Sequence, residues 1–418
     1  MLLKKMRNSL VLFLAAALLL TGFARVAAKP AEKIATPGKK PEVANGSAYA
    51  HYLMGLIYDK QGEFEKAVKE YRQALRFAPR SSEITSQLAN DYAWLGHMYR
   101  RQGKQEKAIQ SYESFLKLRY DDPDKNTAFR FSLATVYEDA GKLKKATSTL
   151  AEIIKLNPKA IEAYMQLGRL YLKRNLPGKG IKIMEKGREL YLRKSDLYLL
   201  PRGGSRDYQE DIQRGIYFLL GIAYSKEGNY DKAISRYQEY LKLDPDNDIV
   251  HFYLGADLDS QGKREESILE LKKAIELNPK NAEALNYLGY LYAEQGIKLD
   301  EAIKLIRRAL EVKPDSSYMM DSLGWALFKK GKFNEALKEL KRAVKLSVAR
   351  DEDDAIIRSH LGDAYFAKGM VKEALRQWKK SLELDPKNDK VREKIKKIQN
   401  KNKTGFTGFN RVNKRNKS

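Results

Sequence analysis

Four histidines are the residues of this chain best suited to acid–base chemistry or metal binding, because an imidazole titrates near neutral pH and can coordinate a metal. They lie far apart and without metal-ligand spacing, at His51, His97, His251 and His360. The motifs HExxH, GxSxG and GxxxxGK(S/T) are absent from the sequence. Because 32% of the residues are charged, we interpret paired acids such as Glu265 and Glu266 as solvated helix surface. We therefore predict no catalytic, cofactor or metal site, and a protein that is not an enzyme.

Residues that would build a framework recur at intervals of about 34 positions. Each copy has a Gly or Ala followed three residues later by Tyr or Leu, and then a small residue, a bulky residue, often Ala and often Pro. One copy consists of Gly55, Tyr58, Ala67, Tyr71, Ala74 and Pro79. The spacings place the first two residues on one face of a first helix and the next three on one face of a second helix. A Gly such as Gly62 separates the two helices at a position that favours left-handed backbone.

This pattern resembles the tetratricopeptide repeat (TPR). Nine copies begin near Ala48, Ala89, Thr127, Ile161, Arg214, Asp248, Ala282, Ser317 and Ala355. The resemblance implies an all-α solenoid of about nine helix-turn-helix repeats in a right-handed superhelix, and a function in protein–protein interaction. We expect an extended second copy because residues 82–88 add helical turns before it, and a weaker second helix in the fourth copy because of Gly180 and Gly187.

The segments outside the repeats have distinct compositions. A basic start, an apolar run from Leu10 to Leu20 and small residues ending at Ala28 are typical of a secretory signal. A cleaved signal is favoured over a retained inner-membrane anchor, because the run is short for a bilayer. The predicted layout is a signal at 1–28, a flexible linker at 29–47, four repeats at 48–192, an insertion loop at 193–213, five repeats at 214–386, a capping helix at 387–400 and a basic disordered tail at 401–418.

The resemblance also implies a partner-binding groove, because in TPR proteins certain positions of each first helix line a concave surface. Carried over to this sequence, the predicted groove residues are Tyr49, Tyr52, Phe131, Phe218, Phe252, Asn286, Tyr290, Tyr318, Trp325 and Phe328. No copy has the Lys and Asn pair with which some TPR domains hold a peptide carboxylate. The alternative, that many of these residues form the core between repeats, stays open at this point.

Charge and the export signal limit the choice of partners. The formal net charge is +25, which favours anionic surfaces. The chain has no cysteine, which excludes disulfides and thioether lipid anchors. We expect an exported, periplasmic or envelope-associated scaffold that binds a protein or peptide. The alternative is a basic protein that docks on anionic lipid or cell-wall polymer, in part through its tail. Nucleic acid is disfavoured as a partner because the predicted signal directs the chain out of the cytoplasm.

Overall fold

The computed structural model describes residues 46–118, 123–193 and 206–412, with side chains except at 206–209 and 401–412. Within these ranges all regular elements are α-helices and no strand is present. The chain forms two compact units. The N-terminal unit is described from Gly46 to Lys232, and the C-terminal unit begins at Ala233. Among the described residues, no helix is both long enough and apolar enough to cross a bilayer.

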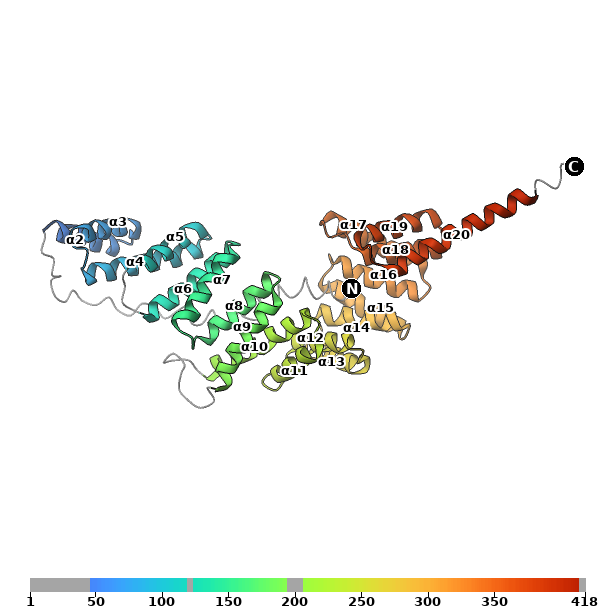
Figure 1. The fold of residues 1–418 in the computed structure, drawn as a ribbon, viewed down its shortest axis with the longest axis horizontal. Helices are drawn as coiled ribbons and strands as arrows, with labels where there is room; N and C mark the ends of the chain where they lie inside the picture. Colours follow the sequence, from blue (N-terminus) through green and yellow to red (C-terminus); the bar gives the residue numbers. More distant parts are fainter. Residues whose placement is uncertain (1–45, 119–122, 194–205, 413–418) are drawn as a thin grey trace. The chain divides into compact units, whose positions relative to one another are not determined.

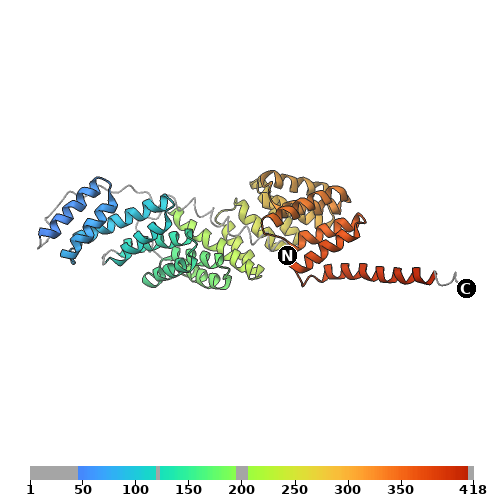
Figure 2. The ribbon, with the colours of Figure 1, turned by 90° about the horizontal axis from the view of Figure 1, so that it is seen from above.

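The N-terminal unit consists of first and second helices in alternation (Figures 1 and 2). Its helices are α2 (Gly46–Lys60), α3 (Phe64–Phe77), α4 (Ser82–Arg101), α5 (Gln105–Lys117), α6 (Pro123–Asp139), α7 (Leu143–Leu156), α8 (Ile161–Lys173), α9 (Pro177–Arg193) and α10 (Arg206–Lys226). The first helices α4, α6 and α8 each pack against the second helix that follows and against the one that precedes, while α2 packs on α3 and α10 packs on α9. The extended start predicted for the second copy is confirmed, because α4 begins at Ser82.

The C-terminal unit repeats the same alternation, and its boundary falls within α11 (Tyr230–Leu241). It contains α12 (Asp248–Ser260), α13 (Arg264–Leu277), α14 (Ala282–Gln295), α15 (Leu299–Val312), α16 (Ser317–Lys329), α17 (Phe333–Ala349), α18 (Ala355–Ala367), α19 (Val371–Leu384) and α20 (Asp389–Val412). The predicted all-α fold of paired helices is therefore confirmed. The handedness of a superhelix stays a prediction.

Local signals in the sequence determine where the helices begin and end. Gly62 has a φ of 75°, and after it the amide of Glu63 donates to the carbonyl oxygen of Tyr58 at 2.9 Å, which closes α2. Several first helices begin with a polar cap. Asn281, for example, accepts a hydrogen bond from the amide of Ala284 at 2.9 Å. Asp354 has the same role at the start of α18, where its side chain accepts from the amides of Ile356 and Ile357.

Small residues allow the paired helices to approach closely. A Cβ atom added at Gly55 would lie 2.4 Å from a ring carbon of Tyr71, and one added at Gly362 would lie 2.4 Å from a ring carbon of Trp378. Each bulky side chain therefore occupies the space that the glycine leaves. Gly187 has the same role in α9, since its added Cβ would lie 2.8 Å from the Cβ of Tyr164. These contacts explain why α9 forms over its full length despite two glycines.

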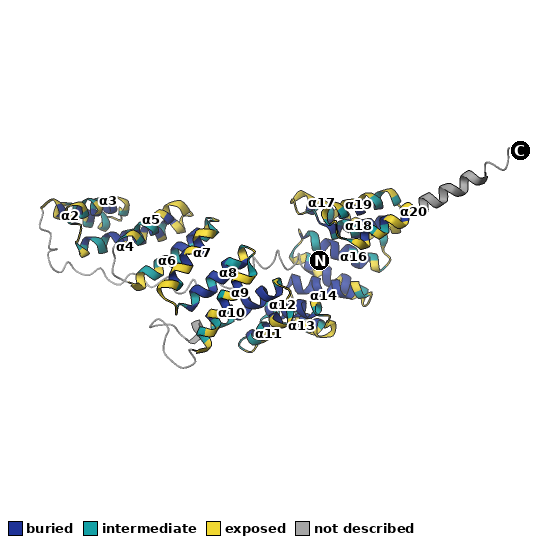
Figure 3. Ribbon diagram, in the orientation of Figure 1, coloured by how far each residue is buried: buried dark blue, intermediate teal, exposed yellow. Residues whose placement is uncertain are grey.

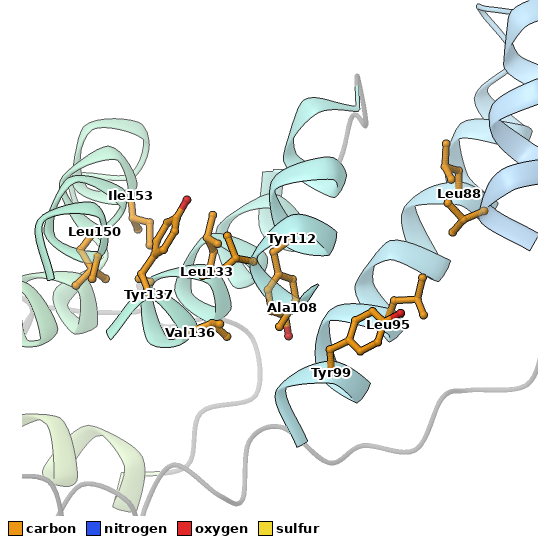
Figure 4. Packing of buried hydrophobic residues seen from close by; sticks show 14 of the residues in the cluster. Leu88, Leu95, Tyr99, Ala108, Tyr112, Leu133, Val136, Tyr137, Leu150 and Ile153 are labelled. Atoms are coloured by element: carbon orange, nitrogen blue, oxygen red, sulfur yellow. The ribbon is translucent and has the colours of Figure 1, made fainter. Parts of the chain in front are cut away.

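The core runs along the stack inside each unit. In the N-terminal unit one cluster of buried side chains links α2 to α9, and Figure 4 shows part of it from Leu88 to Ile153. In the C-terminal unit α14 is the most deeply buried helix, dark blue along most of its length in Figure 3. Val391, Ile395 and Ile398 of α20 are buried against the last repeat. α20 thus covers the end of the stack in the region where a capping helix was predicted.

Two segment predictions were wrong where the structure describes them. Within the predicted loop 193–213, Arg193 belongs to α9 and the chain is helical again from Arg206. Ile212 is buried there, four residues before the buried Ile216, so both lie on one helix face. Because α10 packs on both α8 and α9, the insertion does not separate two blocks of repeats. The division between units lies at Lys232 and Ala233 instead.

The predicted tail differs in the same way. α20 continues to Val412, although 401–418 was expected to be disordered. No proline interrupts the chain between 387 and 412, so nothing in the sequence forces the helix to stop at 400. The linker ends two residues earlier than predicted, because Gly46 and Ser47 already belong to α2. Residues 1–45, which hold the predicted signal and most of the linker, lie outside the described residues, as do 194–205 and 413–418.

Candidate partner-binding face

The ten predicted groove residues divide by burial. Tyr49 is 38% exposed, and the partly exposed residues are Phe131, Tyr318, Trp325 and Phe328. The buried residues are Tyr52, Phe218, Phe252, Asn286 and Tyr290. Tyr49, Tyr52, Phe131 and Phe218 belong to the N-terminal unit and the other six to the C-terminal unit. Whether any of them binds a partner stays a prediction, but the five buried ones present little surface for contact.

The first helices α14, α16 and α18 contact one another and bring several of these residues together. Trp325 stacks on His360, with ring centroids 4.1 Å apart and planes inclined by 14°. It also stacks on Phe328 of its own helix, at 5.0 Å and 8°. Its indole N–H donates to the carboxylate of Glu294 on α14. We call the surface formed by α14, α16 and α18 around Trp325 the tryptophan face.

A buried ion pair supports the tryptophan face from below. Nδ1 of His360 lies 3.0 Å from both carboxylate oxygens of Asp321, and Asp321 is fully buried. Burial by itself disfavours the protonated imidazole, but the negative charge of Asp321, with smaller contributions from Asp363 and Glu294, outweighs it and raises the pKa of His360. Asp321 therefore favours the protonated form of the imidazole, which stacks on the indole of Trp325.

A tyrosine hydroxyl links two neighbouring first helices, α14 and α16, by a hydrogen bond. The hydroxyl of Tyr318 donates to Glu283 of α14, at 2.8 and 2.9 Å from the two carboxylate oxygens. Lys313 neutralises Glu283 at 2.6 Å. Burial, followed by the charge of Glu283, raises the pKa of Tyr318. Burial also raises the pKa of Tyr290, with Glu294 and Asp321 contributing. Both phenols are therefore neutral hydrogen-bonding groups, and Tyr318 is partly a structural residue.

The far edge of the face carries an exposed aromatic side chain. Phe366 of α18 is 48% exposed, and its ring lies 5.6 Å from that of the buried Trp378. Beside it, the carboxylate of Asp363 accepts from the indole N–H of Trp378 at 3.0 Å and pairs with Lys394 of α20 at 2.6 Å. The face thus combines partly exposed rings with carboxylates, which suits apolar, aromatic or cationic side chains of a peptide.

Sequence reasoning missed the Asp321–His360 pair. The two residues are far apart in sequence, at the fifth position of the eighth copy and the sixth of the ninth. The signal that would have found them is an acid and an imidazole at adjacent positions of neighbouring copies, where first helices contact each other. Among the described residues no group of three potential ligands is arranged to hold a metal ion.

Comparisons with known families agree with this architecture. A tetratricopeptide repeat model matches residues 48–81, 215–247 and 355–388, and another matches 94–125. A model described as TPR repeat matches 260–296 and 324–369.

Among curated proteins, a TPR repeat-containing protein of Pseudomonas aeruginosa is 26% identical over 141 residues, which are 34% of this chain and 24% of that protein. Protein O-mannosyl-transferase TMTC1 of Mus musculus is 32% identical over 193 residues, 46% of this chain and 18% of that protein. The chain thus aligns with a quarter or less of the length of these relatives.

Solved structures with similar folds include the APC/C hetero-tetramer Cut9–Hcn1, at 16% identity over 84% of this chain and 75% of that chain, with a TM-score of 0.48. The MamA protein is 26% identical over 43% of this chain and 94% of its own, with a TM-score of 0.35. The family matches fall in both units and coincide with the helix pairs described above. The chain is therefore a tetratricopeptide repeat protein.

Proposed function

We propose that this chain is an exported, non-enzymatic scaffold that binds a protein or peptide partner in the bacterial cell envelope through its tryptophan face. Its repeats belong to a class of modules that mediate protein–protein interaction. The basic, apolar and small-residue start of the sequence supports export.

The observation that carries the choice of surface is the setting of Trp325. Its ring is partly exposed, yet it is held by stacking on the rings of His360 and Phe328 and by a hydrogen bond from its indole N–H. A preorganised aromatic side chain loses little conformational entropy when a partner covers it. Residues of this kind dominate the energy of protein interfaces. Phe328 and Phe366 extend the apolar surface on either side of it.

A competing function follows from charge. The net charge of +25 attracts the chain to anionic lipid or cell-wall polymer. In this second function the repeats act as a spacer. The two functions differ in their dependence on salt. Docking through many lysines should weaken steeply between low and physiological ionic strength. Binding through aromatic anchors should change little over the same range.

Binding is tested by crosslinking in the native envelope, followed by capture of the chain and identification of the crosslinked protein. Trp325→Ala and Phe366→Ala should lose the protein captured by the wild type, with truncations of anchors costing about 2 kcal/mol or more of binding free energy. Leu269→Ala is a matched control, because Leu269 is 66% exposed on α13 and lies outside the tryptophan face. A partner retained equally by all three variants would refute this surface.

Export is tested separately. N-terminal sequencing of the native protein should give a start near Lys29, and fractionation should place the protein outside the cytoplasm. An intact Met1 in a cytosolic fraction would refute export and leave the binding proposal untouched. Phe366→Ala is the cleaner of the two binding variants, since Phe366 is exposed, whereas Trp325 also covers His360. Unchanged thermal unfolding of Phe366→Ala confirms that lost capture reflects a lost contact.

A further inference from the structure

The first helix of the stack, α2, exposes an apolar stripe to solvent. Tyr49, Leu53, Met54 and Ile57 are between 38% and 46% exposed. Tyr49, Leu53 and Ile57 are spaced by four residues and therefore lie along one face of the helix. A terminal repeat normally presents a polar outer face, because a bare apolar face promotes association.

The register of the repeats shows what this stripe would contact. Met54 occupies the seventh position of its copy and is 40% exposed. In the eight later copies the same position is a leucine that is at most 5% exposed, namely Leu95, Leu133, Leu167, Leu220, Leu254, Leu288, Leu323 and Leu361. Leu361, for example, shares a buried cluster with Leu340 and Val344 of the preceding second helix. In α2 this interface between repeats is open, and we call it the α2 seat.

The sequence just before α2 does not favour a further second helix. The second helices of this chain run for 12 to 17 residues without a break. Between 29 and 45, by contrast, Pro30, Pro37 and Pro41 interrupt the chain every few residues. Proline inside a helix removes a hydrogen bond and clashes with the preceding turn. The apolar run further upstream belongs to the predicted signal. The occupant proposed below therefore comes from another molecule.

We propose that the α2 seat is the contact surface for a second copy of this chain, with α2 packing antiparallel on its symmetry mate. A two-fold axis near Leu53 would set Tyr49 of one copy against Ile57 of the other, so the stripe is complementary to itself. Residues 46–58 contain no Lys, Arg, Asp or Glu. In a chain with a net charge of +25, this stretch lets two copies approach without like charges meeting.

The size of the seat determines how strong the pairing is. Four large side chains that each leave about two-fifths of their area exposed would bury roughly 500–700 Å² over both copies. Stable dimers usually bury about 1,200 Å² or more. We therefore expect a reversible dimer that forms only at elevated concentration. Fixation of the chain at a common surface would raise that concentration.

The test is the mass of the full chain as a function of concentration. Sedimentation velocity from about 1 μM to about 1 mM should show the wild type moving from monomer toward dimer. Leu53→Glu should stay monomeric over the whole range, because a charge near the axis meets its own copy. Leu156→Glu is the matched control, since Leu156 is 62% exposed on α7 and should leave the dimer intact.

A second measurement places the axis. The chain has no cysteine, so Leu53→Cys introduces a single thiol. Oxidation should crosslink it at least several-fold faster than Leu156→Cys at the same concentration, because two copies of residue 53 meet at the axis. A wild-type monomer at every concentration, or equal crosslinking of the two variants, overturns the proposal. A monomer whose unfolding temperature falls on Met54→Glu would assign the seat to residues 1–45 and overturn it as well.

Discussion

Gly289 gives the strictest test of how the repeats pack, because the glycine meets backbone as well as side chain. It lies on α14 where that helix crosses α15. A Cβ atom added there would lie 2.6 Å from Cγ1 of Ile306 and 2.9 Å from the carbonyl oxygen of Ala302. A side chain can change rotamer, but the carbonyl oxygen moves only if α15 moves with it. The substitution Gly289→Ala should therefore be destabilising, even though alanine is the better helix former.

The expected magnitude is the balance of two effects. Alanine in place of glycine stabilises a helix by about 1 kcal/mol. Overpacking a well-filled core costs about 1–3 kcal/mol. Because a backbone atom is among the clashes, we expect the upper half of that range and a net loss of about 1–2 kcal/mol. Gly324→Ala is the comparison: its nearest contacts, at 2.5 and 2.9 Å, are the flexible side chain of Leu340, and the backbone nitrogen is 3.3 Å away.

The assay is urea unfolding followed by helical circular dichroism. Repeat arrays often unfold in stages, so midpoints are compared only where the slopes agree. Gly289→Ala should unfold at lower urea than Gly324→Ala, and Gly324→Ala should stay near the wild type. A Gly289→Ala variant as stable as the wild type would mean that α14 and α15 do not approach as closely as described here.

Three further predictions concern buried charge and the cap. Burial, with Asp59 contributing, raises the pKa of Asp91 to about 8. Between about pH 4 and 8 the folded chain therefore holds a proton that the unfolded chain lacks. The stability of the fold falls as the pH rises through that window. Asp91→Asn should therefore gain in unfolding temperature over the wild type from pH 5 to pH 8, and a constant gap would contradict this. The raised pKa of His360 makes stability fall with rising pH as well, but here because a favourable contact is lost: the stability from its pair with Asp321 is full below about pH 6.5 and is lost above the raised pKa. His360→Gln should therefore cost more at pH 6 than at pH 9, and equal melting shifts at both would refute the ion pair. Ile395→Asp should place an unpaired charge on the buried face of α20 and lower the free energy of unfolding by about 3 kcal/mol or more. An unchanged free energy of unfolding would mean that α20 does not cap the stack.

Local features of the fold could be predicted from the sequence because the same residue types recur at the same positions of successive copies. The left-handed backbone at Gly62 and at its equivalents follows from a glycine at the end of the first helix in eight of the nine copies, with Asn175 in its place in the fourth. The cap at α20 follows from Val391, Ile395 and Ile398, whose spacing continues the helical period. Errors arose where the repeat register lapses. A loop was predicted for 206–213 because Pro201, Gly203 and Gly204 lie just before it. The structure has a helix there instead, and Ile212 lies on its buried face.

The candidate site was harder to predict because it depends on contacts between copies. The resemblance predicted groove positions on the first helices, and Tyr290, Trp325 and Phe328 lie on the two neighbouring helices α14 and α16. It did not distinguish residues that face solvent from residues that face the next copy. Asn286 is fully buried for this reason, whereas Trp325 remains partly exposed. That distinction requires the distance between first helices, which no single copy contains.

A repeat protein carries its own controls, since each position occurs nine times in nearly the same environment. Most positions keep one chemistry: the seventh is a buried leucine in eight copies. The exceptions lie on the first helices. Met54 lies in the α2 seat, and Asp91 occupies a position that is apolar in every other copy. The third exception is the pair of Asp321 and His360 beside Trp325. An apolar residue would avoid the cost of burying a carboxyl group at Asp91 and a charge at Asp321, so packing alone does not account for these acids. The departures from the repeat, rather than the repeat itself, are therefore where experiments on function should begin.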